Sequence, residues 1–134
     1  MITVEVVVAH LSSFPYAVKV LENDVPDLTS TTIYVSYATI APQHVPNPLD
    51  SMLYNQHGED LFQTFDIHIV STISNFPAIW SDIYKLIFGW NPTTGEINAS
   101  GFVKGEGGKI GMSNGYMHWI DRWMISFPTL NVTL

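Results

Sequence analysis

The sequence predicts a single α+β domain, in which a mainly antiparallel sheet of about four long strands plus a hairpin packs against two α-helices. Segments in which apolar and polar residues alternate predict the strands, and apolar residues three and four positions apart predict an amphipathic helix. The chain has 134 residues, of which 46% are hydrophobic and 13% charged. That size and composition suit one hydrophobic core, so we treat residues 1–134 as one domain.

The first third of the chain predicts a helix followed by two strands. Residues 3–13 place apolar side chains at helical spacing behind Thr3, a good helix cap, although their β-branched content also suits a strand. We favour the helix. Residues 16–20 alternate as a short strand, and the run TTIYVSYATI, residues 31–40, alternates as a longer one.

The middle of the chain predicts a long loop, a strand and a helix. Residues 41–60 hold three prolines and no clear period, which indicates a long surface loop with a functional use. The next strand, residues 61–73, should put its apolar residues on the core face and its polar residues on a wet face or a contact surface. The expected core residues are Leu61, Phe65, Ile67, Ile69 and Ile73, opposite Thr64, Asp66, His68 and Thr72. The helix should bury a stripe of Phe76, Trp80, Ile83, Ile87 and Trp90 and end near Gly89.

The last third predicts a glycine-rich hairpin and a long strand. GFVKGEGGKIGM, residues 101–112, suits two short strands joined by a glycine-rich turn. From residue 115 to residue 127 a strand should follow, with Met117, Trp119, Trp123, Ile125 and Phe127 on one face.

Charge and composition exclude several classes of function. The formal net charge is -7, from 12 acidic and 5 basic residues, and the basic residues are scattered. A nucleic-acid binder needs a basic surface to neutralise phosphates, and an anionic membrane needs the same. With 0 Cys there is no disulfide and no thiolate metal site. The start of the chain lacks the basic segment of a signal peptide and no segment is long enough to span a bilayer, so we expect a soluble protein.

The segment GMSNG, residues 111–115, fits the G-x-S-x-G pattern of a hydrolase nucleophile elbow, and His118 and Asp121 follow it. A small serine hydrolase using Ser113 is therefore one alternative. The pattern requires a strand-to-helix turn, whereas here a Ser-Asn-Gly turn, residues 113–115, should start a strand in which His118 and Asp121 face opposite ways. We therefore expect no catalytic residues and favour a protein that is not an enzyme.

Asp121 stands out because it shares the apolar strand face with Trp119 and Trp123. A buried carboxylate needs partners, so three interpretations are open. An ordinary surface position is the favoured one. A tryptophan N–H donor and a contact between subunits are the alternatives.

The sequence offers two candidate ligand sites, and neither has the residue pattern that its ligand requires. A phosphate-binding loop among the glycines of residues 105–111 would need a glycine at Val103 and a hydroxyl at Ile110. A metal site could use Asp66 and His68, which share a strand face, but no familiar ligand spacing supports it. The preceding loop would add His44, His57, Glu59 and Asp60. We expect no cofactor and no metal.

The order of these elements carries a resemblance to a known family. The segments are TTIYVSYATI, the loop after it, DLFQTFDIHIVSTI, NFPAIWSDIYKLIFGW and GYMHWIDRWMISFPTL. In layout and length the chain resembles the tail-terminator, or tail-completion, proteins of long-tailed bacteriophages, the family of minor tail protein U. It departs from them in its first segment and in the hairpin from Gly101 to Met112.

The resemblance implies a structural virion protein, located in the phage tail or neck and in the host cytoplasm during assembly. Such a protein forms a homohexameric ring on the tail tube, stops tube polymerisation and joins the tail to the neck and head connector. The implied partners are further copies of the chain, the tail tube protein, a neck or head-completion protein and a tail sheath, while DNA passes through without specific binding and no membrane is involved. Another neck or baseplate adaptor is the alternative. The candidate interface residues are His44, Asn47, Tyr54, His57, Lys104, Lys109, Asp121 and Arg122.

Overall fold

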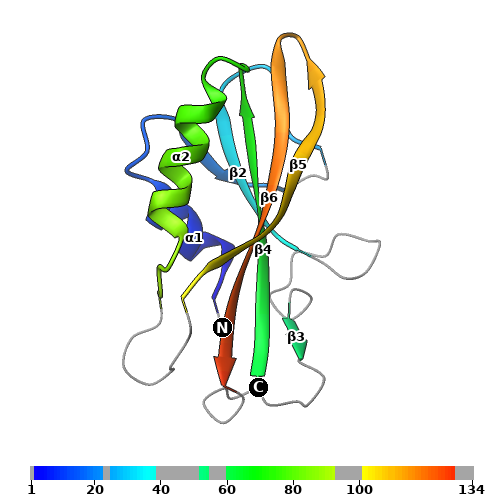
Figure 1. Cartoon of the computed structure of the whole chain (residues 1–134). Coiled ribbons are helices and arrows are strands. Elements are labelled where there is room, and N and C mark those ends of the chain that lie inside the picture. The colour runs from blue at the N-terminus through cyan, green and yellow to red at the C-terminus, as the bar shows by residue number, and fades with distance from the viewer. Residues whose placement is uncertain (1, 23–24, 39–51, 55–59, 93–100, 129–134) are drawn as a thin grey trace.

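A six-stranded sheet with two helices on one face forms the fold (Figure 1). The computed structural model describes residues 2–22, 25–38, 52–54, 60–92 and 101–128. The helices are α1 (Val4–Leu11) and α2 (Phe76–Ile87). The strands are β1 (Ala17–Val20), β2 (Thr32–Tyr37), β3 (Met52–Tyr54), β4 (Asp60–Ser71), β5 (Val103–Ser113) and β6 (Tyr116–Pro128). The predicted α+β class is confirmed.

The sheet has the strand order β1-β2-β4-β6-β5, and β3 pairs with β4 beside this path. β4 and β6 form the longest strand pair of the sheet, which runs from Asp60↔Pro128 to Ser71↔Met117. β1 runs parallel to β2, and the other pairs are antiparallel. The sheet is thus mainly antiparallel as predicted, with one parallel pair at its edge.

The core lies between the helices and one face of the sheet. Alternate residues of β2, β4 and β6 fill it from the sheet, and each helix adds one stripe. In α2 the fully buried stripe is Ile79, Ile83 and Ile87. The predicted stripe was therefore partly wrong, because Phe76, Trp80 and Trp90 are only partly buried and pack along its side. Isoleucines spaced four apart let the helix approach the sheet. The larger aromatic side chains of Phe76, Trp80 and Trp90 pack beside this contact.

Two buried side chains of the sheet fasten α1, which confirms the predicted helix. Thr3 occupies the cap position without a side-chain hydrogen bond. Instead, Tyr37 Oη accepts a hydrogen bond from the Val4 N–H at 3.1 Å. The amide of Gln63 holds the backbone of Ile2, accepting from its N–H at 3.0 Å and donating to its carbonyl at 2.6 Å. The N–H of the first helical residue is therefore satisfied by a group distant in sequence.

The two helices meet at their C-terminal ends. His10 of α1 stacks on Trp90 with ring centroids 3.7 Å apart. Its Nε2 lies 2.8 Å from the carbonyl oxygen of Leu86, in the last turn of α2, and donates to it. Gly89 follows with a φ of 77°, a left-handed residue near the helix end as predicted.

The predicted hairpin over residues 101–112 was wrong. Residues 103–113 form one strand, and the reversal comes at Asn114 and Gly115, whose φ angles are 55° and 82°. The predicted Ser-Asn-Gly turn before the last strand is confirmed. Two positive φ angles in a two-residue loop define the hairpin turn that an Asn-Gly pair favours. The glycines upstream lie within β5, which has register shifts between Lys104 and Gly107 and between Lys109 and Gly111.

Two boundaries in the middle of the chain also differ from prediction. Within the predicted loop of residues 41–60, Met52–Tyr54 form β3 and Asp60 begins β4. The remaining loop residues lie outside the described ranges. β4 ends at Ser71, so Ile73, expected in the core, is 59% exposed in the connection to α2.

Candidate functional site

The predicted interface residues fall into two groups. His44, Asn47 and His57 lie outside the described residues, and Tyr54 ends β3. The other four lie on the β5–β6 hairpin: Lys104, Lys109, Asp121 and Arg122. The structure pairs Lys104 with Asp121 and pairs Arg122 with Asp66 of β4, at N···O distances of 3.3 and 3.1 Å.

Asp121 is buried, with an exposed fraction of 1%, so the favoured interpretation of a surface position was wrong. Its Oδ1 accepts a hydrogen bond from Trp119 Nε1 at 2.8 Å and pairs with the Lys104 ammonium at 3.3 Å. The tryptophan donor considered from the sequence is confirmed. A Cβ atom at Gly107 would collide with this carboxylate, which explains a glycine at that position. Asp121 thus joins β5 to β6 within one chain.

The helix-free face of the sheet carries a line of three buried polar side chains. Ser36 Oγ lies 3.0 Å from His68 Nε2, and His68 Nδ1 lies 2.9 Å from His118 Nε2. Their exposed fractions are 4%, 5% and 8%. Of the two alternatives for this face, a wet face or a contact surface, the wet face is therefore wrong at these residues. Burial lowers the pKa of His118. Because one of the two facing ring nitrogens must donate and the other accept, the pair can take up at most one proton without breaking.

A hydroxyl followed by two imidazoles has the order of a nucleophile, a base and an orienting group. The surroundings do not suit catalysis, however. Ser36 lies opposite Asp66 in the β2–β4 pairing, so it stands within the sheet. Ser36 is also buried in a regular strand rather than presented on a turn. We interpret the three residues as a satisfied polar network that fixes the register of β2, β4 and β6.

The hydrolase and metal sites considered from the sequence do not assemble among the described residues. Ser113 is exposed beside the hairpin turn, whereas His118 is buried and bonded to His68. The Asp66 carboxylate accepts a hydrogen bond from Arg122 and forms an ion pair with it. No group of three potential metal ligands occurs in the ranges that the structure describes. His44, His57 and Glu59 lie outside them.

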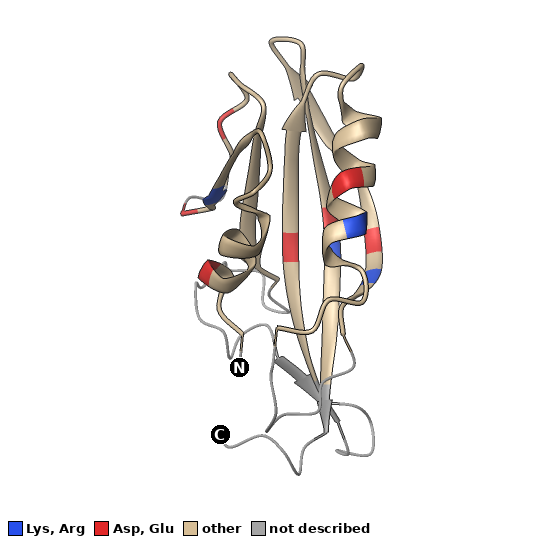
Figure 2. Ribbon diagram, turned by 90° about the vertical axis from the view of Figure 1, so that its left-hand side faces the viewer, with Lys and Arg blue, Asp and Glu red and all other residues tan. Residues whose placement is uncertain are grey.

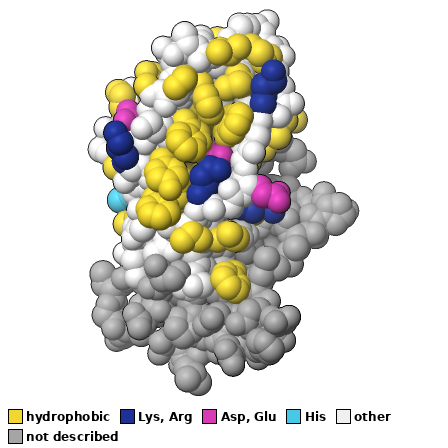
Figure 3. Space-filling view, in the orientation of Figure 1, with side chains coloured by type: hydrophobic (Ala, Val, Ile, Leu, Met, Phe, Trp, Pro, Cys, Tyr) yellow, Lys and Arg dark blue, Asp and Glu magenta, His cyan; other side chains and the backbone are white. Residues whose placement is uncertain are grey.

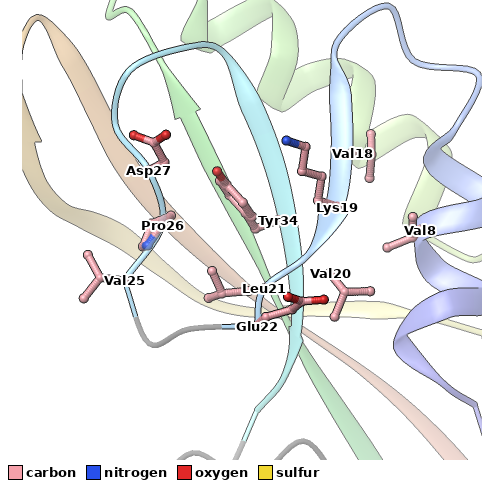
Figure 4. A pocket seen from close by; sticks show the side chains of 10 residues that line it. All are labelled: Val8, Val18, Lys19, Val20, Leu21, Glu22, Val25, Pro26, Asp27 and Tyr34. Carbon is pink, nitrogen blue, oxygen red and sulfur yellow. The ribbon is translucent and has the colours of Figure 1, made fainter.

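A pocket of about 600 Å³, lined by both apolar and charged side chains, lies at the β1 edge of the sheet (Figure 4). We call it the β1-edge pocket. Val8 of α1 and Val18 and Val20 of β1 form its apolar wall, and Tyr34 lies across it. Its charged lining is Lys19, Glu22 and Asp27. Sequence reasoning missed it, because it depends on the parallel β1–β2 pairing and on the chain returning between these strands.

The opposite edge of the sheet is β5, which carries exposed apolar residues among lysines. Val103, Ile110 and Met112 are exposed, and Lys109 lies between them without an ion-pair partner among the described residues. Figure 3 shows hydrophobic side chains gathered in a band down the middle of the face in view, with basic groups among them and at its sides. The two register shifts and four glycines make β5 an irregular edge.

Charge is dispersed over the described ribbon, where acidic and basic segments occur on helices, strands and loops (Figure 2). Two of the five basic residues, Lys104 and Arg122, form ion pairs within the chain. The scattered cations predicted from the sequence are therefore also scattered in space. No helix within the described ranges has the length and apolar character needed to cross a membrane.

Comparison with known proteins adds no relative: no protein-family model matches the chain, and no curated protein sequence is significantly similar to it.

Proposed function

We propose that this chain is a structural virion protein that caps the end of a phage tail tube as a ring, stops tube polymerisation and joins the tail to the neck. The observation that carries the proposal is the order of elements. The described chain runs α1-β1-β2-β3-β4-α2-β5-β6, with both helices on one face of a mainly antiparallel sheet. This is the architecture that the tail-terminator resemblance implies.

The chemistry of the described surface supports an assembly role rather than catalysis. The buried carboxylate, the histidine pair and the serine all have partners within the chain. Function would then lie in contact surfaces, which need shape and apolar anchors but no reactive group. With a net charge of -7, the wall of such a ring would repel DNA rather than hold it.

Tail assembly in vitro tests this function. Tail tube protein from the same phage genome is allowed to polymerise with and without the purified chain. We expect the chain to bind one end of each tube, to arrest elongation and to appear as a ring in particle reconstructions. A chain that stays monomeric and never co-purifies with tails would contradict the proposal.

The alternative is a neck or baseplate adaptor of the same shape. Such an adaptor would be found in the particle away from the tube end and would leave tube length unchanged. The position of the density in the reconstruction separates the two.

A further inference from the structure

We infer that the β1-edge pocket binds the β5 edge of a second copy of this chain, through Lys109, Ile110 and Met112. This inference rests on the proposed ring and names its contact. β1 and β5 are the first and last strands of the main sheet order, so pocket and β5 edge lie on opposite sides of the molecule.

The apolar parts of the two edges are complementary. The pocket offers the side chains of Val8, Val18 and Val20, from α1 and β1. On β5, Ile110 is 61% exposed and Met112 is 45% exposed, although both are large apolar residues. Docking these residues against the valines would remove apolar surface from water on both copies.

The side chains proposed to meet also lie on the same side of the sheet in the two edge strands, β1 and β5. Lys109 and Met112 lie opposite Trp119 and Met117 of β6, on the helix side of the sheet. Val18 and Val20 pair with Ile33 and Val35, whose side chains are core residues on that same side. A neighbour that lies beside β1 with the helix side of its sheet facing the same way would therefore bring Lys109 and Met112 toward the valines, without any pairing between strands.

The charges are complementary as well. Glu22 and Asp27 line the pocket and are exposed, against one lysine, Lys19. Lys109 has no ion-pair partner among the described residues. A neighbouring Lys109 would find excess negative charge there, which favours this orientation over one that joins two pockets.

The contact is made by side chains rather than by extension of the sheet. β1 has four residues, and β5 has two register shifts and lysines along it. Short length, bulges and lysines each disfavour direct strand pairing at an edge. Because the two surfaces differ, the contact is head-to-tail, and repeating it gives a closed ring when the rotation between copies permits.

Disulfide cross-linking tests the contact directly, since the chain has 0 Cys and any disulfide must come from introduced residues. Met112→Cys and Val18→Cys proteins are prepared separately, mixed in equal amounts and oxidised, both free in solution and bound to tails. We expect a cross-linked dimer from the mixture and none from either variant alone. Ile73→Cys is the matched control, because Ile73 is an exposed apolar residue that follows the central strand β4 rather than an edge strand, and its mixture with Val18→Cys should stay monomeric.

Charge exchange provides the second measurement. Lys109→Glu should weaken self-association about tenfold, and pairing it with a Glu22→Lys, Asp27→Lys variant should restore most of that loss. A protein that forms oligomers but gives no mixed cross-link and no charge rescue overturns this contact while leaving the ring intact. A Met112→Cys protein that cross-links to itself overturns the head-to-tail arrangement. A chain that is monomeric both in solution and with tails removes the proposed function, and the contact with it.

Discussion

The buried amide of Gln63 makes two hydrogen bonds to the backbone of Ile2, so its loss would leave an N–H and a carbonyl buried without partners. We expect Gln63→Leu to lower the free energy of unfolding by about 3 kcal/mol, measured by urea denaturation. Tyr37→Phe removes only the acceptor for the Val4 N–H and should cost about 1 kcal/mol. Equal costs for the two variants would contradict this account of how α1 is held.

Gly107 and Gly108 provide a matched pair for testing the Asp121 contact. A methyl group at Gly107 would meet the Asp121 carboxylate, whereas one at Gly108 would meet nothing within 4 Å. Gly107→Ala should therefore reduce the free energy of unfolding by about 1–3 kcal/mol, through displacement of the carboxylate from Trp119 and Lys104. Gly108→Ala should change it by less than about 1 kcal/mol, in either direction. Thermal melting of the two variants decides between a specific contact and a general need for glycine.

The buried histidine pair makes stability depend on pH. Burial lowers the pKa of His118 below its ordinary value of 6.5, so the unfolded chain binds a proton that the folded chain resists. Its contribution is therefore complete above pH 6.5 and is lost as the pH falls from there toward the lowered pKa. We expect His118→Gln, which cannot titrate, to show a shallower fall in the free energy of unfolding between pH 7.5 and pH 5.5.

Histidines outside the pair act in both proteins, so the difference between the two pH profiles reports on the His68–His118 pair. Asp66 and Arg122, which lie on the same sheet face as His68 and His118, are paired with each other. Parallel profiles for native and His118→Gln protein would contradict the expectation.

At the scale of elements, the β5–β6 hairpin depends on its two-residue turn. Gly115 has a φ of 82°, a conformation that costs a β-branched residue heavily. Gly115→Val should therefore lower the free energy of unfolding by about 2 kcal/mol. Gly111→Ala, at a position with ordinary φ and open space, is the control and should have a small effect. If instead Gly111→Ala were the costlier change, the glycine-rich segment would be the reversal, as the sequence first suggested.

The elements predicted correctly are those whose pattern is local. The apolar residues repeat regularly within each of four segments, namely α1, β2, β4 and β6. The structure has a helix or strand where each of these repeats predicts one. β5 was misread because glycines usually mark turns, whereas here they accommodate register shifts and the Asp121 carboxylate. The parallel β1–β2 pair was missed because no local pattern records the direction of a neighbouring strand.

The polar contacts were missed for a related reason. His68 and His118 were both assigned to the face away from the core, but their contact depends on the β4–β6 register, in which Val70 rather than His68 lies opposite His118. Lys104 and Asp121 likewise meet only through the shifted β5–β6 pairing. Register between distant strands is set by the whole sheet, so a single sequence provides candidates for such contacts but not the pairs.

At the scale of the whole molecule, the two ends of the sheet differ while the surface as a whole is acidic. A ring would bring chains of net charge -7 together, and their mutual repulsion acts over a longer range than the Lys109 contact. The screening length falls from about 30 Å at 0.01 M salt to about 8 Å at 0.15 M, which suppresses the repulsion between chains more than the contact at the pocket.

We therefore expect self-association to strengthen as salt rises from about 0.01 M to 0.15 M, opposite to the behaviour of a complex held chiefly by ion pairs. Sedimentation velocity across this range measures it directly. Lys109→Glu should keep the positive salt dependence, because it adds to the net negative charge, while associating more weakly at each concentration. Association that weakens steadily with salt would mean that charge attraction dominates the contact. The apolar contact between Met112 and the β1-edge valines would then not be the main contribution to association.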